Sequence, residues 1–265
     1  MFFLTDTHCH LDFDSFDSDR DAVIQRAREA GVGRMLNPGI DLQSSRVALR
    51  LAHCYDEVYA ACGVHPNDAR KWEEGSQAEM YEMLKQDKVV AVGEIGLDYY
   101  RDRAPRDLQK RVLSEQLVLA EKTGLPVILH NRQATKDMLE MLSAWHTHLV
   151  ASGSPLAEKP GVLHSFSGDL VAARKAVEMN FMIGVTGPVT YKNADELRQI
   201  VALVPLSALL IETDAPFLTP NLHRGERNEP AYVRWIAERI AKIHNLTVQA
   251  VAERTSANSQ KVFNW

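Results

Sequence analysis

The sequence alternates short apolar runs with longer amphipathic segments, and this alternation limits the fold more than any other feature of the chain. The runs are apolar throughout, which is typical of strands covered on both faces of a parallel sheet. The segments between them carry apolar side chains at helical spacing; residues 104–123, for example, place Leu108, Val112 and Leu117 on one stripe. Eight such runs favour closure into an α/β fold of the (β/α)8 TIM-barrel type over an open doubly wound sheet.

The predicted elements fill the whole chain. The strands are expected at residues 1–6, 35–36, 58–62, 89–92, 125–129, 161–163, 181–184 and 209–211. The helices are expected at residues 18–30, 41–55, 76–85, 104–123, 133–146 and 194–204, with another starting at Asp169 and two more after Glu229, separated near Asn245. This arrangement leaves one extra C-terminal helix. Because no linker or low-complexity tract divides the sequence, we expect a single domain over residues 1–265.

Charge and cysteine content limit the possible partners and the compartment. The formal net charge of −5 argues against a general grip on duplex nucleic acid, but it leaves room for a locally basic cleft. Three cysteines without Cys-x-x-Cys spacing favour a reducing compartment. The opening Met-Phe-Phe-Leu-Thr-Asp is too short for a signal peptide or a spanning helix. We therefore expect a cytoplasmic protein with no membrane and no obligate protein partner.

Histidines and carboxylates follow the predicted strands. They are His8 and His10, His65, Glu94, His130, His164 and Asp214. Because the carboxyl ends of the strands of a (β/α)8 barrel meet at one face, these side chains are expected to converge there. A single histidine at a strand end is more often structural, but so many ionisable groups would be costly to bury without partners. The pattern predicts a metal site, from which the alternating Cys9 points away as a buried, inert thiol.

The number and type of these residues predict two divalent metal ions. Imidazoles with carboxylates suit Zn²⁺, Mn²⁺, Fe²⁺ or Ni²⁺, whereas Mg²⁺ prefers a nearly all-oxygen set. Six of these residues, all except His65, are the candidate ligands, and six are too many for one catalytic ion with an open position. We assign His8, His10 and Asp214 to one ion and His130 and His164 to the other, with Glu94 as the bridge. A water between the ions would attack as hydroxide, and Asp214 would accept its proton, so Glu94 and Asp214 are the predicted catalytic residues.

Six motifs resemble those of the TatD family of metal-dependent hydrolases and deoxyribonucleases, in the same order along essentially the whole chain. They are Thr5-Asp6-Thr7-His8-Cys9-His10-Leu11, Gly63-Val64-His65-Pro66, Gly93-Glu94-Ile95-Gly96-Leu97-Asp98, His130-Asn131-Arg132, His164-Ser165-Phe166-Ser167-Gly168 and Glu212-Thr213-Asp214-Ala215-Pro216. The resemblance implies a TIM-barrel metallohydrolase of the amidohydrolase type. It gives the ligand role to the same residues and places His65 beside the site.

Basic and aromatic residues near these motifs predict how a substrate is held. The candidates are His65, Tyr99, Arg101, Arg132 and Lys192. Arginine binds phosphate through its planar fork, and tyrosine offers a stacking face to an unpaired base. The resemblance implies hydrolysis of DNA, including removal of nucleotides from a 3′ end, so the expected partners are single-stranded DNA ends or a small phosphoester.

The sequence leaves other functions open. The same metal-activated water would attack a lactone, an amide or a phosphoester in a dinuclear amidohydrolase-type enzyme, because a fold does not fix the substrate. A mononuclear deaminase and a barrel that only binds are further alternatives. The native metal and the physiological substrate are not determined by these patterns.

Overall fold

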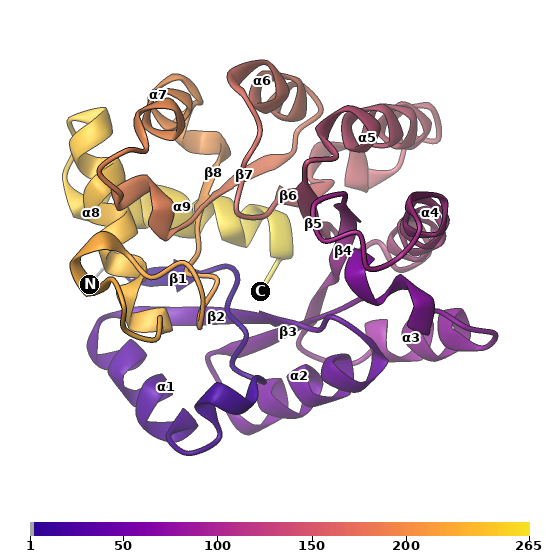
Figure 1. Ribbon diagram of the computed structural model, residues 1–265, viewed down its shortest axis with the longest axis horizontal. Coiled ribbons are helices and arrows are strands. Elements are labelled where there is room, and N and C mark those ends of the chain that lie inside the picture. The colour runs from indigo at the N-terminus through magenta and orange to yellow at the C-terminus, as the bar shows by residue number, and fades with distance from the viewer. Residues whose placement is uncertain (1–2) are drawn as a thin grey trace.

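The computed structural model describes residues 3–265. Within this range the chain forms one α/β domain, in which eight parallel strands follow one another in sequence order around a nearly closed barrel (Figure 1). The strands are β1 (Leu4–Asp6), β2 (Val32–Pro38), β3 (Val58–Cys62), β4 (Val89–Asp98), β5 (Val127–Arg132), β6 (Gly161–Leu163), β7 (Met182–Val185) and β8 (Leu209–Ile211). The predicted TIM barrel is therefore confirmed.

The helices lie mostly around the outside of the strands, whereas the last one runs toward the middle of the barrel (Figure 1). They are α1 (Arg20–Glu29), α2 (Leu42–Cys54), α3 (Ser76–Leu84), α4 (Arg106–Thr123), α5 (Thr135–Ala151), α6 (Leu170–Glu178), α7 (Asp195–Leu203), α8 (Val233–His244) and α9 (Val248–Phe263). The last of these is the predicted extra C-terminal helix, and Asn245, with a φ of 53°, ends α8 in the left-handed conformation that asparagine tolerates. None of the helices described is long and apolar enough to cross a membrane.

Each predicted strand overlaps an observed one, but several observed strands are longer. Residues 1–2 of the first predicted strand lie outside the described part of the chain, and β1 itself begins at Leu4. The largest difference is in β4, which continues beyond Val92 as far as Asp98 and is buried along its whole length. Glu94 therefore lies within a strand, and the sheet itself fixes the position of its backbone.

The barrel closes where β1 meets β8. Beyond the ends of the two strands, Thr7 N donates to the carbonyl of Ile211 at 3.2 Å and Asp214 N donates to the carbonyl of His8 at 2.8 Å. The buried carboxylate of Asp6 accepts a hydrogen bond from Thr213 N at 2.8 Å. These bonds hold the segments after β1 and β8 side by side, which brings His8 next to Asp214.

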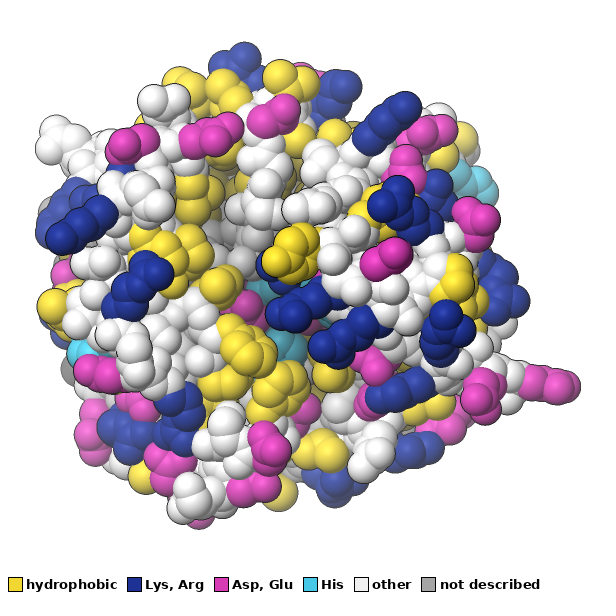
Figure 2. Space-filling view, in the orientation of Figure 1, with side chains coloured by type: hydrophobic (Ala, Val, Ile, Leu, Met, Phe, Trp, Pro, Cys, Tyr) yellow, Lys and Arg dark blue, Asp and Glu magenta, His cyan; other side chains and the backbone are white. Residues whose placement is uncertain are grey.

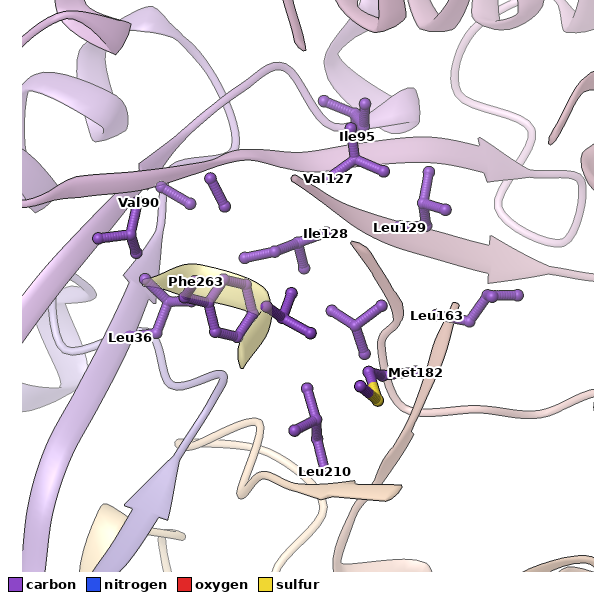
Figure 3. Packing of buried hydrophobic residues seen from close by; sticks show 14 of the residues in the cluster. Leu36, Val90, Ile95, Val127, Ile128, Leu129, Leu163, Met182, Leu210 and Phe263 are labelled. Atoms are coloured by element: carbon purple, nitrogen blue, oxygen red, sulfur yellow. The ribbon is translucent and has the colours of Figure 1, made fainter. Parts of the chain in front are cut away.

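Helix α9 completes the barrel at this seam. The side-chain amide of the buried Asn258 donates to the carbonyls of Leu206 and Leu209, each at 2.8 Å. At the end of the helix, Phe263 belongs to the same buried cluster as Leu36, Ile128 and Leu210 of the strands (Figure 3). The C-terminal helix is thus part of the core and holds the start of β8 in place.

We expect Asn258→Ala to lower the free energy of unfolding by about 1–3 kcal/mol, because two buried carbonyl groups lose their donor. Urea-induced unfolding followed by circular dichroism measures this change. The exposed Gln249→Ala on the same helix is the control and should change stability by less than about 0.5 kcal/mol. Equal unfolding midpoints for the two variants would show that Asn258 does not hold the seam.

Candidate metal centre

The six predicted ligands come together at the carboxyl end of the barrel. On one side of the group, His8 Nε2 and His10 Nε2 lie 3.2 Å apart. Glu94 Oε2 is 3.4 Å from His8 Nε2 and 3.7 Å from His10 Nε2. Asp214 Oδ1 lies 3.8 Å from the first nitrogen and 3.7 Å from the second. Four atoms from the segment after β1, from β4 and from the loop after β8 thus face one another.

These distances fit a divalent cation. Ligand atoms about 2.1 Å from a tetrahedral ion lie about 3.4 Å from one another, which is the range observed here. Glu94 and Asp214 form ion pairs only with histidines among the described residues, with no lysine or arginine. Because a buried carboxylate needs a compensating positive charge, this donor set is suitable for a metal ion.

Glu94 faces a second group of histidines with its other oxygen. Its Oε1 lies 2.9 Å from His130 Nδ1, 3.7 Å from His65 Nε2 and 3.9 Å from His164 Nε2. His164 Nε2 is also 3.7 Å from Asp214 Oδ1, so it connects the two groups. The predicted neighbour His65 is therefore within the cluster itself, where it can serve as a metal ligand as well as a substrate contact.

Local backbone geometry brings these side chains together. Gly96 pairs with His130 between β4 and β5, and an added Cβ at Gly96 would lie only 2.0 Å from the carbonyl oxygen of His130. Only glycine permits this close approach of the two strands beside Glu94. At the other side, Asp214 has a φ of 57°, a left-handed conformation that aspartate tolerates better than most residues. Its backbone turns there so that its carboxylate faces the histidines.

Charge and burial set the protonation of the cluster. Burial opposes ionisation of Glu94, but the surrounding histidines, above all His65, lower its pKa well below its usual range. Burial, together with repulsion from His130, lowers the pKa of His65 to about 3. Burial also lowers the pKa of His8. An ionised Glu94 beside neutral His8 and His65 is the protonation state in which these residues bind a metal.

Two buried carboxylates behind the ligands were not among the predicted site residues. Glu212 Oε1 lies 3.0 Å from His164 Nδ1, and Asp98 Oδ2 lies 3.3 Å from His130 Nε2. Burial alone would lower the pKa of His164, but Glu212 outweighs it and raises that pKa to about 10. Such carboxylates orient metal-binding imidazoles. The available sequence signal was their place inside the motifs Gly-Leu-Asp98 and Glu212-Thr-Asp, directly beside ligand positions.

Cys9 lies between the two N-terminal histidines but points away from the cluster, as expected. Its thiol is fully buried and donates to the carbonyl of Leu36 at 3.7 Å. Burial raises the pKa of this thiol well above its usual value. Cys9 therefore packs in the core and offers no reactive thiolate.

A cavity of about 870 Å³ opens above the cluster. Figure 2 shows a central hollow with histidine side chains at its floor, basic side chains gathered on one side and most of the nearby hydrophobic ones on the other. Of the predicted substrate residues, Arg101, Arg132 and His65 line this cavity. Tyr99 and Lys192 are not in its lining: the Tyr99 hydroxyl donates to Asp137 Oδ2 at 2.7 Å, and Lys192 is exposed elsewhere. The structure thus brings three of the five together.

Comparisons with known proteins agree with this geometry. A family model described as TatD related DNase matches residues 5–264. The uncharacterized metal-dependent hydrolase YabD of Bacillus subtilis is 41% identical over 260 residues, which is 98% of each chain. The 3′-5′ ssDNA/RNA exonuclease TatD of Salmonella typhimurium is 36% identical over 264 residues, or 97% of this chain and 98% of that relative. The crystal structure of YjjV, a TatD homologue from Escherichia coli K12, matches with a TM-score of 0.91 at 36% identity and covers 99% of this chain and 98% of its own.

We expect Glu212→Gln to weaken metal binding about 10- to 100-fold, because His164 loses the negative charge that orients its ring and increases its basicity. Competition with a fluorescent chelator measures the affinity for Zn²⁺ and Mn²⁺. Glu253→Gln, on the exposed face of α9, is the matched control and should bind as the unaltered protein does. Unchanged affinity in Glu212→Gln would show that Glu212 serves the fold and not the metal centre.

Proposed function

The chain is a metal-dependent hydrolase of the TatD family, and we propose that it is a two-metal phosphodiesterase that removes nucleotides from the 3′ end of single-stranded DNA. The observation that carries this proposal is the position of Glu94. Its Oε2 lies 3.4 Å from His8 Nε2, and its Oε1 lies 2.9 Å from His130 Nδ1. One carboxylate therefore faces two separate sets of donors, as a bridging ligand must.

In this proposal the ligands divide as their contacts do. His8, His10 and Asp214 would hold one divalent ion, and His130 and His164 would hold the other, with Glu94 between them. Two of the observed groups of donors, His8 with His10 and His65 with His130, share Glu94, while His164 also lies beside His8 and Asp214. When bound, two such ions lower the pKa of a water molecule and stabilise the attacking and leaving oxygens of a phosphodiester. The mixed nitrogen and oxygen donors are compatible with Zn²⁺, Mn²⁺, Fe²⁺ or Ni²⁺, and Mg²⁺ is a further candidate.

Asp214 is the proposed proton acceptor. Its side chain lines the cavity and is 14% exposed, compared with 4% for the side chain of Glu94. A water molecule that attacks from the cavity can therefore transfer a proton to Asp214 Oδ1, while Glu94 stays fixed among the histidines. This gives the two predicted catalytic residues different roles: Asp214 moves a proton and Glu94 positions the donors.

Arg101 and Arg132 are the proposed phosphate contacts. Both line the cavity, and the guanidinium of Arg132 lies 4.0 Å from the centre of the Tyr100 ring, which keeps it at the mouth. Such a planar fork can donate two hydrogen bonds to one phosphate group. These arginines make the mouth locally positive although the whole chain has a formal net charge of −5, so an anionic strand end is attracted to the mouth and not to the general surface.

The relatives support the choice of substrate to different degrees. The Salmonella protein is named a 3′-5′ ssDNA/RNA exonuclease, whereas the Bacillus protein is named only as a metal-dependent hydrolase. We infer the 3′-to-5′ direction and the single-stranded substrate from the likeness to the Salmonella protein. A lactone, amide or small phosphoester remains the alternative substrate class, and the apolar part of the cavity lining, which includes Leu197 and Ile200, favours such a small molecule.

The proposal is tested with metal-stripped protein reloaded with each candidate ion and a 5′-labelled single-stranded oligonucleotide. We expect stepwise shortening from the 3′ end with at least one ion and none in excess chelator. Asp214→Asn should lower the rate about 10²- to 10⁴-fold, because an amide accepts no proton. Asparagine also tolerates the left-handed backbone of this position, so the loop is kept.

The exposed Asp87→Asn, at the opposite end of the barrel from the cavity, is the matched control and should retain full activity. If no ion supports nucleotide release while a lactone, amide or small phosphoester is hydrolysed, the alternative replaces the nuclease proposal. Near-normal turnover by Asp214→Asn would remove Asp214 as the proton acceptor.

A further inference from the structure

An exposed aromatic side chain stands at the mouth of the cavity. Phe217, in the loop after β8, lines the cavity and is 52% exposed, although a phenylalanine gains stability from burial. Its backbone is nevertheless fixed. Phe217 N donates to the carbonyl of Asp214 at 2.8 Å, and the side-chain amide of the buried Asn228 donates to the carbonyl of Phe217 at 2.5 Å. The exposed ring therefore sits on a rigid support.

Phe217 is connected to the candidate ligands through a second aromatic residue. Its ring meets the ring of Phe13 edge to face, with the centroids 5.8 Å apart and an interplanar angle of 76°. Phe13 in turn stacks on the ring of His10, with the centroids 4.7 Å apart at 24°. This series of rings starts at a candidate metal ligand and ends at an exposed apolar face in the mouth.

The two sides of the mouth differ in chemistry. Arg101 and Arg103 follow β4, and Arg132 is the last residue of β5, so all three lie on the side of Glu94 and His130. Phe13 and Phe217 follow β1 and β8, on the side of His10 and Asp214. Figure 2 shows basic side chains gathered on one side of the hollow and most of the hydrophobic ones across from them, with one hydrophobic side chain among the basic group. The mouth can therefore bind phosphates on one side and an apolar ring face on the other.

We propose that Phe217, supported by Phe13, stacks on the base of the 3′-terminal nucleotide and so recognises the leaving nucleotide. This inference rests on the proposed function. In an exonuclease site, the part of the strand that remains after cleavage carries several phosphates. In this proposal that part lies along the arginines. On the other side of the scissile bond a single nucleotide has no further phosphodiester, and its base offers a flat face for stacking. Such stacking tolerates any base but requires that a base is present.

The test compares oligonucleotides with a normal and an abasic 3′-terminal nucleotide. Phe217→Ala should lower kcat/KM for release of the normal terminal nucleotide about tenfold or more. The same variant should lower kcat/KM for release of the abasic nucleotide less than about twofold. Phe217→Tyr, which keeps a stacking ring, should remain within about twofold of the unaltered protein on both. Leu203→Ala, an equally exposed apolar residue at the end of α7 away from the mouth, should change neither value.

A binding measurement tests the contact between Phe217 and the terminal base without requiring turnover. With chelator present, binding of a strand that carries 2-aminopurine at its 3′ end should quench the fluorescence of that base, and Phe217→Ala should abolish the quenching. Equal losses by Phe217→Ala on the normal and abasic strands, or no loss on either, would overturn the stacking role. If the unaltered protein releases no nucleotide from either strand, the proposed function fails, while the quenching still decides whether Phe217 contacts the base.

Discussion

A buried carboxylate surrounded by imidazoles is the interaction on which the site depends. Glu94 is 3% exposed, and its two oxygens lie between 2.9 and 3.9 Å from ring nitrogens of five histidines: His8, His10, His65, His130 and His164. A single charge in such a place is costly unless positive charge compensates for it. A bound metal ion would supply that charge, and the histidines offer neutral nitrogen donors for it. The cost of burying the charge of Glu94 therefore accounts both for the histidines around it and for the need for a metal ion.

The fold brings together residues that lie far apart in the sequence. His10 and Asp214 lie more than two hundred residues apart, yet Asp214 Oδ1 is 3.7 Å from His10 Nε2 because the ends of β1 and β8 are joined. The carboxylate of Asp6 joins the segments that follow the two strands, and the amide of Asn258 anchors the start of β8. The same loop after β8 then places Phe217 at the mouth. Closure of the barrel, assembly of the ligands and the shape of the entrance thus depend on one seam.

The strands and the convergence of the candidate ligands could be predicted from the sequence because both depend on simple rules. Apolar runs at regular spacing identify buried parallel strands, and the topology of a barrel brings their carboxyl ends together. Loop residues could not be placed in the same way. Tyr99 follows β4 directly, but its hydroxyl binds Asp137, and the loop that leads onward contains Asp102 with a φ of 49°. Glu212 and Asp98 were missed because their role depends on contacts with His164 and His130 that no periodicity reveals.

The most direct test of the bridging role of Glu94 is a crystal structure of the Mn²⁺- or Zn²⁺-loaded protein with anomalous diffraction. We expect two anomalous peaks at the carboxyl end of the barrel, one beside His8 and His10 and one beside His130, with an oxygen of Glu94 bound to each. One peak at full occupancy, with the donors around His130 still free in excess metal, would contradict the bridging role of Glu94. In that case the two oxygens of Glu94 would serve a single ion, and the two-metal mechanism would have to be abandoned.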